Sequence, residues 1–333
     1  MEENHDFMNR TWNWAILGCG RIAAKFAADL KLVPQARLYA AAARDPQRAA
    51  EFAQEHGFEK SFGSYEEMVR DPGVDVVYVA TPHSHHHRHT LLCLDHGKAV
   101  LCEKAFALNA IQAGEMIARA REKGLFLMDA FWTRFQPAFL RVMEILQSGD
   151  LGRVRMMRSD FAFHGPYDPE KRLYNPELGG GSLLDIGIYP VFWALQALGK
   201  PARIRALAEM SATGIDESLS VIFQYPGGEL ASLQSSFACW SDTQTEFWCE
   251  RGFLRIRRMG ISTTHLTIWR DDQSREEIPF HYEQGLGYHL EAAHVMECLD
   301  QGLTESPLLP LSFTLDMMET LDRVSVGIGE GRN

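Results

Sequence analysis

Short apolar runs alternate with stretches of helical periodicity over about the first 130 residues of this 333-residue chain. The apolar runs predict strands at residues 14–17, 37–43, 60–62, 74–80, 99–102 and 125–128. Helical stretches fall between them, ending near residue 30 and then covering about 46–56, 64–70, 86–95 and 111–123. Such alternation predicts a doubly wound parallel sheet, because each helix carries the chain back across the sheet.

The pattern changes beyond about Ala130, where strand-like segments follow one another closely. They cover residues 153–163, 202–210, 218–224, 229–237, 245–249, 253–257 and 264–269. The turn residues at 225–228 (YPGG) join two of them as a hairpin. We therefore expect an α/β protein with a dinucleotide-binding domain at residues 1–130 and an α+β domain at 131–333. The second domain would carry an open, mainly antiparallel sheet, and its last helix could pack back on the first domain.

Composition narrows the range of partners. The chain is 46% hydrophobic and 23% charged, and its formal net charge is −11. This balance is typical of a globular protein and disfavours nucleic acid and anionic membranes as partners. The first residues (MEENHDFMNRTW) are polar, and we find no apolar run that approaches the width of a bilayer. The six cysteines are scattered without CxxC spacing, which predicts reduced thiols and a cytoplasmic location.

A glycine motif lies between the first strand and the first helix. Gly18, Gly20 and Ala23 form G-x-G-x-x-A, and this position between a strand and a helix is typical of a Rossmann-type dinucleotide site. Gly18 would make the tight turn, and Gly20 would let a pyrophosphate approach the backbone. The N-terminus of the helix would supply N–H groups to the phosphates.

The end of the second strand bears on the choice of dinucleotide. An acid there typically binds the ribose 2′-hydroxyl of NAD, whereas arginine suits the 2′-phosphate of NADP. This chain has Arg44 at that position, with Asp45 one residue later and Arg48 one helical turn further on. We predict NADP, with NAD as the alternative. In the competing interpretation Arg44 is a solvated surface residue and Asp45 caps the next helix.

Five histidines follow the fourth strand: His83, His85, His86, His87 and His89. Cysteine or carboxylate ligands do not join them at metal-binding spacing, so we predict no metal site. The loop lies at the carboxyl edge of the sheet, where α/β proteins bind ligands, so one histidine facing the cofactor is expected.

Lys104 follows the fifth strand directly, with only Glu103 between it and the apolar run 99–102. An unpaired buried ammonium is costly. Either Lys104 is paired with Glu103, or it projects into the crevice where a nicotinamide would lie.

A second motif, LGGGSLLDIGIYPVFWALQALG, spans residues 178–199. Asp185 and Tyr189 are four residues apart and would share one helix face. In the alternative interpretation Ser182 and Asp185 form a capping box, and Pro190 predicts a kink. If Lys104, Asp185 and Tyr189 met near a nicotinamide, the ammonium would lower the pKa of the phenol and the three would form a hydride-transfer site.

Several segments together resemble the Gfo/Idh/MocA oxidoreductase family. They are AILGCGRIAAKF, VVYVATPHSHH, LCEKAF, MDAFWTRFQP, GGGSLLDIGIYP and GYHLEAAHVMECLDQGLTESPLLP. The resemblance runs from about Trp14 to Val324 and is strongest to the branch with dimeric dihydrodiol dehydrogenases, NADP-dependent D-xylose dehydrogenases and glucose–fructose oxidoreductase. It implies a Rossmann domain joined to an open-faced sheet that commonly mediates oligomerisation, so a homodimer or higher homo-oligomer is expected.

The resemblance also assigns residues. Lys104 matches the lysine of the family's Glu-Lys-Pro motif, Asp185 the helix aspartate, and Tyr189 the proton donor of this branch. The expected cofactor residues are Gly18, Gly20, Arg21, Ile22, Arg44, Thr81, His86, Glu103 and Lys104. The expected substrate residues are Trp132, Arg134, Phe163 and Arg172, and Phe161, His164, Tyr167 and Tyr174 are further candidates for the pocket lining. Two positions depart from the family pattern. Ala105 replaces the usual proline, so the Lys104–Ala105 peptide bond could be cis or trans. His83 replaces the asparagine that is common after Thr-Pro.

These observations predict an NADP(H)-dependent oxidoreductase. It would transfer hydride between nicotinamide and a secondary alcohol of a sugar, polyol or cyclic vicinal diol, as D-xylose (aldose) or trans-dihydrodiol dehydrogenases do. The alternatives are a non-catalytic dinucleotide-sensing regulator and an NAD-dependent glycosidase of the same fold.

Overall fold

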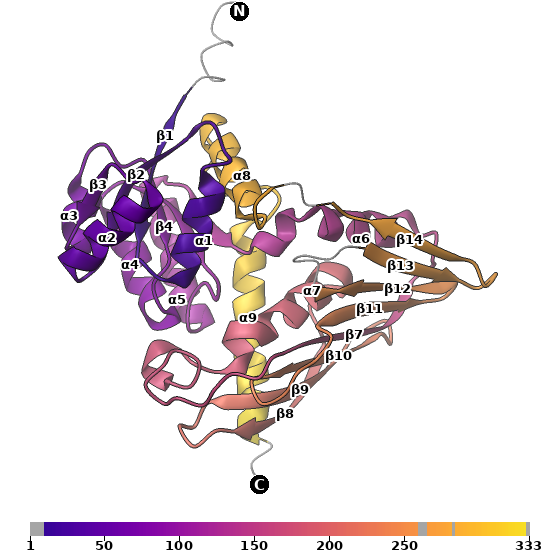
Figure 1. The fold of residues 1–333 in the computed structure, drawn as a ribbon. Helices are drawn as coiled ribbons and strands as arrows, with labels where there is room; N and C mark the ends of the chain where they lie inside the picture. Colours follow the sequence, from indigo (N-terminus) through magenta and orange to yellow (C-terminus); the bar gives the residue numbers. More distant parts are fainter. Residues whose placement is uncertain (1–9, 259–264, 282–283, 331–333) are drawn as a thin grey trace, which may run out of the picture. The chain divides into compact units, whose positions relative to one another are not determined.

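The computed structural model describes residues 10–258, 265–281 and 284–330, and Figure 1 shows the order of their helices and strands. The chain divides into two compact units. The first comprises Met1–Trp132 and Glu283–Leu315, and the second comprises Thr133–Tyr282 and Asp316–Asn333. Each unit is described by itself.

The first unit contains a six-stranded sheet in the order β3-β2-β1-β4-β5-β6, and every neighbouring pair is parallel. The strands are β1 (Trp12–Leu17), β2 (Ala36–Ala42), β3 (Lys60–Phe62), β4 (Val76–Val79), β5 (Ala99–Glu103) and β6 (Leu127–Ala130). All residues of β4, β5 and β6 are buried, as expected for a parallel sheet covered on both faces. The predicted doubly wound sheet is confirmed.

Helices connect these strands: α1 (Arg21–Leu30), α2 (Pro46–His56), α3 (Tyr65–Arg70), α4 (His83–Asp95) and α5 (Ala110–Lys123). Helix α1 packs against α2, whereas α4 packs against α3 and α5. Helix α4 begins three residues before the predicted start at His86.

A segment from late in the sequence completes the first unit. Helix α8 (Tyr288–Asp300) packs against α1. The buried Asp29 carboxylate on α1 accepts backbone N–H groups from Leu286 and Tyr288 at 2.8–2.9 Å. The ring of Tyr288 stacks on Trp132 with centroids 4.4 Å apart. Residues 283–315 therefore form part of the dinucleotide-binding unit.

The second unit contains an eight-stranded sheet in the order β14-β13-β12-β11-β7-β10-β9-β8. Its strands are β7 (Val154–Ala162), β8 (Arg203–Met210), β9 (Asp216–Gln224), β10 (Leu230–Ser236), β11 (Gln244–Cys249), β12 (Gly252–Arg257), β13 (His265–Arg270) and β14 (Arg275–Pro279). The neighbours are antiparallel except β7 and β10, which are parallel. The predicted mainly antiparallel sheet is confirmed. The start of the predicted strand 264–269 at residue 264 lies outside the described residues.

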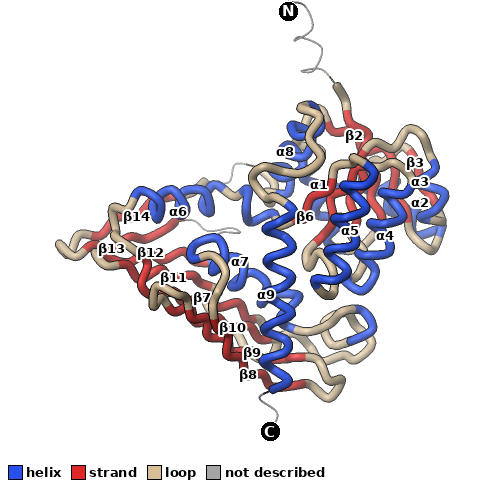
Figure 2. Tube along the Cα trace, turned by 180° about the vertical axis from the view of Figure 1, so that it is seen from behind, coloured by secondary structure: helices blue, strands red, loops and turns tan. Residues whose placement is uncertain are grey.

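Helical segments line one face of this sheet. They are α6 (Pro137–Ser148), a π-helical turn η4 (Leu183–Gly187), α7 (Ile188–Leu198) and α9 (Leu311–Glu330), the last with residues in both units. Segments η4 and α7 contact β7 and β10, and Figure 2 shows α7 beside these strands. Trp193 of α7 packs on Phe247 of β11 and on Phe139 of α6. We call this the covered face and the opposite one the outer face.

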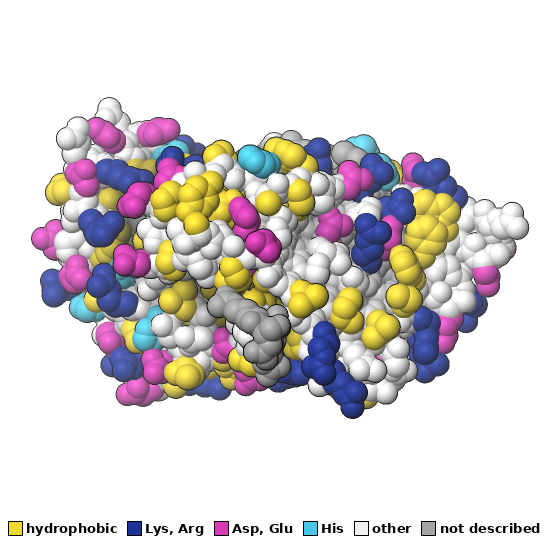
Figure 3. Space-filling model, turned by 90° about the horizontal axis from the view of Figure 1, so that it is seen from below, with side chains coloured by type: hydrophobic (Ala, Val, Ile, Leu, Met, Phe, Trp, Pro, Cys, Tyr) yellow, Lys and Arg dark blue, Asp and Glu magenta, His cyan; other side chains and the backbone are white. Residues whose placement is uncertain are grey.

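One expectation about apolar length needs correction. Residues 176–198 are long and apolar enough to cross a membrane, although 83% of their apolar 18-residue stretch is buried inside the protein. Such burial is typical of a core helix, because a membrane span would present its apolar side chains to lipid. In the view of Figure 3, hydrophobic side chains lie in small groups among charged and other polar side chains.

Candidate active site

The glycine loop after β1 is built for close approach. Gly18 has φ +105°, and a Cβ added there would lie 2.9 Å from the Thr81 side chain and 3.0 Å from the Ala80 carbonyl oxygen. A Cβ added at Gly20 would meet nothing within 4 Å. Helix α1 begins at Arg21 without a side-chain cap among the described residues. Open space at Gly20 beside uncapped N–H groups fits the pyrophosphate of a dinucleotide, with Arg21 and Ile22 in the first helical turn.

Two arginines, Arg44 and Arg48, follow the end of β2. Burial raises the pKa of Tyr65, and the charges of Arg44, Arg48 and Arg88 act against that shift. Arg48 also donates to the carbonyl oxygen of Cys19 in the glycine loop, at 2.8 and 3.2 Å. Asp45 caps α2 by accepting the N–H of Gln47. Asp45 thus caps the helix and Arg44 is exposed, as the competing interpretation expects.

The histidines of α4 have separate environments. His83, His86 and His89 are buried, and His87 pairs with Glu115 at 2.6 Å. Burial is the largest cause that lowers the pKa of His86 to about 4 and of His89 to about 3. Within the described ranges, no group of three or more His, Cys, Asp or Glu side chains is arranged to hold a metal ion.

His86 links Thr81 to the segment after Lys104. Its Nε2 lies 2.7 Å from the carbonyl oxygen of Thr81, and its Nδ1 lies 2.8 Å from that of Ala105. A neutral imidazole has a single N–H, so His86 can donate a hydrogen bond to only one of these two carbonyl oxygens at a time. We take the ring as neutral because burial and the charge of Lys104 both disfavour the imidazolium.

Lys104 follows the end of β5 at the carboxyl edge of the parallel sheet. The carboxylate of Glu103 accepts two hydrogen bonds. One comes from the backbone N–H of Lys104 at 3.1 Å, and the other comes from the hydroxyl of Tyr78. The Lys104–Ala105 peptide bond is cis, which answers the question left open by the missing proline.

Two buried acids beside this segment were missed by the sequence analysis. Asp129 of β6 and Glu291 of α8 are fully buried, and no described residue makes a hydrogen bond to either carboxyl group. Burial and the charge of Glu103 raise the pKa of both well above the ordinary value. The pKa of Asp129 is also affected by the ammonium of Lys104, which opposes the shift. Their clustering depends on chain segments far apart in sequence, which local patterns do not reveal.

In the second unit, Asp185 forms an ion pair with Arg172. The two Arg172 Nη atoms lie 2.7 and 3.2 Å from the two carboxylate oxygens of Asp185, and this fork geometry is the strong form of the interaction. The capping-box alternative is wrong. Ser182 makes no cap hydrogen bond, and its hydroxyl donates to Asp216 at 2.9 Å.

The backbone around Asp185 is irregular. Asp185 lies in the π-helical turn η4, and Tyr189 lies in the first turn of α7. Because Pro190 has no N–H, it cannot donate to the carbonyl of Ile186, which favours an irregular turn over a continuous α-helix. Such turns are frequent at functional sites.

Tyr189 packs against an aromatic side chain of β7. Its ring packs on Phe161 with centroids 5.5 Å apart, and Phe161 contacts Phe163 at 6.4 Å. Tyr174 lies in the buried cluster with Ile186, Ile215 and Phe237, whereas His164 and Tyr167 are exposed. Burial lowers the pKa of Arg134, whose guanidinium lies 5.3 Å from the Phe139 ring centroid.

The predicted residues thus fall into two sets. The first unit holds the glycine loop, Arg44, Thr81, His86, Glu103, Lys104 and Trp132. The second unit brings Arg172, Asp185, Tyr189, Phe161 and Phe163 to one region around η4 and α7.

Comparison with known proteins identifies the family. Residues 12–131 match an oxidoreductase family model with an NAD-binding Rossmann fold, and residues 139–255 match the GFO/IDH/MocA C-terminal domain. The chain belongs to the GFO/IDH/MocA oxidoreductase family. It is therefore an enzyme of the dehydrogenase type that uses a nicotinamide cofactor.

Individual proteins also align with nearly the whole chain. Trans-1,2-dihydrobenzene-1,2-diol dehydrogenase of Mus musculus is 38% identical over 327 residues, which cover 95% of this chain and 96% of the relative. KijD10, a 3-ketoreductase from Actinomadura kijaniata crystallised with NADP and TDP-benzene, has a TM-score of 0.87 at 25% identity, covering 96% and 98% of the two chains. An aldose-aldose oxidoreductase from Caulobacter crescentus has a TM-score of 0.88 at 24% identity, covering 97% and 99%.

Proposed function

We propose that this protein is an NADP(H)-dependent oxidoreductase that acts on a secondary alcohol of a cyclic vicinal diol, sugar or polyol. The observation that carries the proposal is the 38% identity, over 95% of the chain, to a dehydrogenase of a cyclic trans-diol. The aromatic rings of Phe161, Phe163 and Tyr189 offer apolar surface to such a carbon ring, and Arg172 offers hydrogen-bond donors to its hydroxyl groups.

Tyr189 carries the proton in this mechanism. A bound nicotinamide would supply the hydride acceptor for the carbinol C–H bond when the alcohol is oxidised. Tyr189, as a phenolate, would accept the hydroxyl proton while the ketone forms, and would then release that proton to water. Lys104 stabilises negative charge on the reacting oxygen, and Asp185 positions the substrate hydroxyl together with Arg172. Trp132, Arg134 and Phe163 complete the proposed substrate residues.

NADP is the proposed cofactor, with NAD as the alternative. The arginines that follow β2 support it: Arg44 is exposed there, and Arg48 donates to the carbonyl oxygen of Cys19 in the glycine loop. Guanidinium groups suit a 2′-phosphate, whereas a free acid would suit a 2′-hydroxyl. Gly18, Gly20, Arg21, Ile22, Thr81, His86, Glu103 and Lys104 are the other proposed cofactor residues.

We further propose a homo-oligomer, most simply a homodimer, formed through the part of the outer face that strands β8, β9, β10, β7 and β11 provide. Five adjacent strands each present one exposed large hydrophobic side chain there: Leu207, Ile222, Leu230, Met156 and Trp248. Alternate residues on the same strands, such as Leu219, Val221 and Phe223, are buried on the covered face. A contiguous apolar stripe on an exposed sheet marks an interaction surface, and a second copy would cover it symmetrically.

A cytoplasmic location is proposed as well. All six cysteines are free thiols, which suits a reducing compartment. The proposed ligands are small molecules; neither nucleic acid nor a membrane is a proposed partner.

The test follows the absorbance of NADPH with a panel of trans-dihydrodiols, pentoses, hexoses and anhydro-sugars, each with NADP and with NAD. Stoichiometric reduction of NADP by a diol or sugar is expected. Hydrolysis of a glycoside without net change in cofactor would instead favour the glycosidase, and cofactor binding without turnover of any substrate would favour the regulator.

A further inference from the structure

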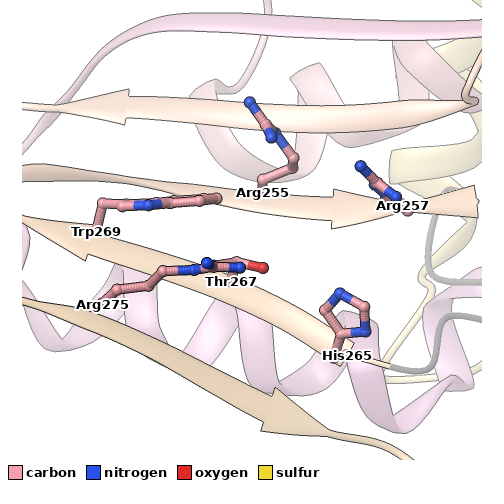
Figure 4. A pocket seen from close by; sticks show the side chains of 6 residues that line it. All are labelled: Arg255, Arg257, His265, Thr267, Trp269 and Arg275. Carbon is pink, nitrogen blue, oxygen red and sulfur yellow. The ribbon is translucent and has the colours of Figure 1, made fainter.

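The second unit carries a hollow of about 190 Å³ on the outer face of its sheet. Six side chains from β12, β13 and β14 line it: Arg255, Arg257, His265, Thr267, Trp269 and Arg275. Figure 4 shows Arg255 and Arg257 projecting to the same side of β12. The intervening residues Leu254, Ile256, Leu266 and Ile268 are buried on the covered face, so strand alternation alone places these six together.

Charge distinguishes this hollow from the rest of the chain. The titratable side chains that line it, among the described residues, are three arginines and one histidine, whereas the whole chain carries a net charge of −11. A concentration of guanidinium groups in one concavity of an acidic protein points to an anionic ligand.

Each of the three arginines forms an ion pair with a carboxylate through one guanidinium nitrogen, and its other N–H groups can bind a ligand. Arg255 and Arg257 use Nε, toward Glu246 at 2.6 Å and Asp242 at 3.5 Å. Arg275 pairs with Glu277 through a single Nη group. The ion pairs of Arg257 and Arg275 are exposed to solvent, and exposed ion pairs contribute little to stability. An anion that engages several guanidinium groups at once can therefore compete with them.

The side chains are also held in place before a ligand arrives. Trp269 stacks on Phe253 with centroids 4.1 Å apart and planes at 10°. The guanidinium carbons of Arg255 and Arg275 lie 5.2 and 5.4 Å from the Trp269 ring centroid. Fixing long side chains in advance lowers the entropy lost on binding.

Size and shape select the class of anion. Pockets for drug-sized ligands typically measure about 300–1,000 Å³, so this smaller hollow suits a compact ligand. A carboxylate is planar and matches one guanidinium fork, whereas a phosphate group offers oxygens in several directions. The hollow has guanidinium groups from β12 and β14 and the Thr267 hydroxyl of β13, and donors on several sides suit a phosphate group. We propose that this hollow binds a small phosphate-bearing anion, separately from the dinucleotide.

The test is equilibrium dialysis of the full-length protein with radiolabelled inorganic phosphate and pyrophosphate. The site variant is R257A/R275A, and the matched control is R141A/R153A. The control removes two arginines of the second unit that are ion-paired to glutamates and do not line the hollow. Folding of both variants is checked by circular dichroism.

We expect saturable binding to the wild type and the control, and at least about a tenfold weaker affinity in the site variant, since two charge-assisted contacts are lost. Sulfate should compete and acetate should not. The proposal is overturned if the wild type shows no saturable binding, if both variants weaken equally, or if the site variant binds as the wild type does. Competition by acetate equal to that by sulfate would overturn the assignment to phosphate.

Discussion

The guanidinium of Arg172 holds the carboxylate of Asp185 through two contacts, at 2.7 and 3.2 Å. The family resemblance implies a substrate-binding role for Arg172 and a catalytic role for Asp185. Their pairing means that replacing either residue also alters the other.

The pair leads to a prediction about non-additivity. R172Q and D185N should each lower kcat/KM, and the double variant should lose less than the product of the two losses, with a coupling free energy of about 0.5–3 kcal/mol. Steady-state kinetics of the three variants with the best substrate of the panel measure this. Strictly additive losses would show that the two side chains act independently.

Tyr189 should be essential for turnover but not for cofactor binding. Y189F removes the proposed proton carrier, so kcat should fall by about 10²–10⁴. The affinity for NADPH, followed by fluorescence titration, should not change. The control is Y225F, because Tyr225 lies in the hairpin turn of the same unit and is not a proposed site residue. A Y189F enzyme with normal kcat would remove the phenol from the mechanism.

Arg44 should set the preference for the 2′-phosphate. R44A should weaken NADP binding by about tenfold or more, the value of one charge-assisted contact, and leave NAD binding nearly unchanged. R37A is the control, since Arg37 lies on β2, which ends two residues before Arg44, and pairs with Glu59. Dissociation constants for both dinucleotides, measured by calorimetry, decide the outcome. Equal weakening of NAD and NADP would indicate a general effect on the fold.

The buried acids Asp129 and Glu291 should make stability fall as the pH rises. Their pKa values are raised in the folded state, so the folded protein binds more protons than the unfolded chain above the ordinary values near 4. Their contribution is fully present below those values and is lost as the pH rises through the folded-state pKa.

D129N and E291Q keep the shape of the protonated acids and should flatten this dependence. The measurement is the free energy of unfolding by urea at several pH values from 5 to 9. E115Q is the control, because Glu115 pairs with His87 in the same unit. A variant whose stability changes with pH as steeply as the wild type would contradict the assignment.

The apolar stripe on the outer sheet face should hold two copies together. L207E/I222E places charges in the proposed interface and should shift the protein from dimer to monomer in light scattering coupled to size exclusion. L140E alters an exposed leucine of α6 instead and should leave the mass unchanged. A wild-type protein that is monomeric at all concentrations would refute the interface.

Much of the first unit could be predicted from sequence because its signals are local. Strand β3 and helix α2 have the predicted bounds, since Asp45, Pro46 and Gly57 mark the ends of α2 within a few residues. The antiparallel hairpin at residues 225–228 is confirmed, with Tyr225 and Glu229 joined by a backbone hydrogen bond. Strand β14 was missed because REEIP has weak alternation and becomes a strand only through pairing with β13.

The sequence alone therefore determined the order of strands and helices in the first unit and the position of Gly18 and Lys104 at strand ends, because caps, turns and hydrophobic period act over a few neighbouring residues. Only the tertiary structure decided that Arg172 pairs with Asp185, that Asp129 and Glu291 are buried without hydrogen-bond partners among the described residues, and that residues 283–315 join the first unit. Burial and ion pairing depend on which distant segments pack together, and the local pattern of residue types carries no record of that choice.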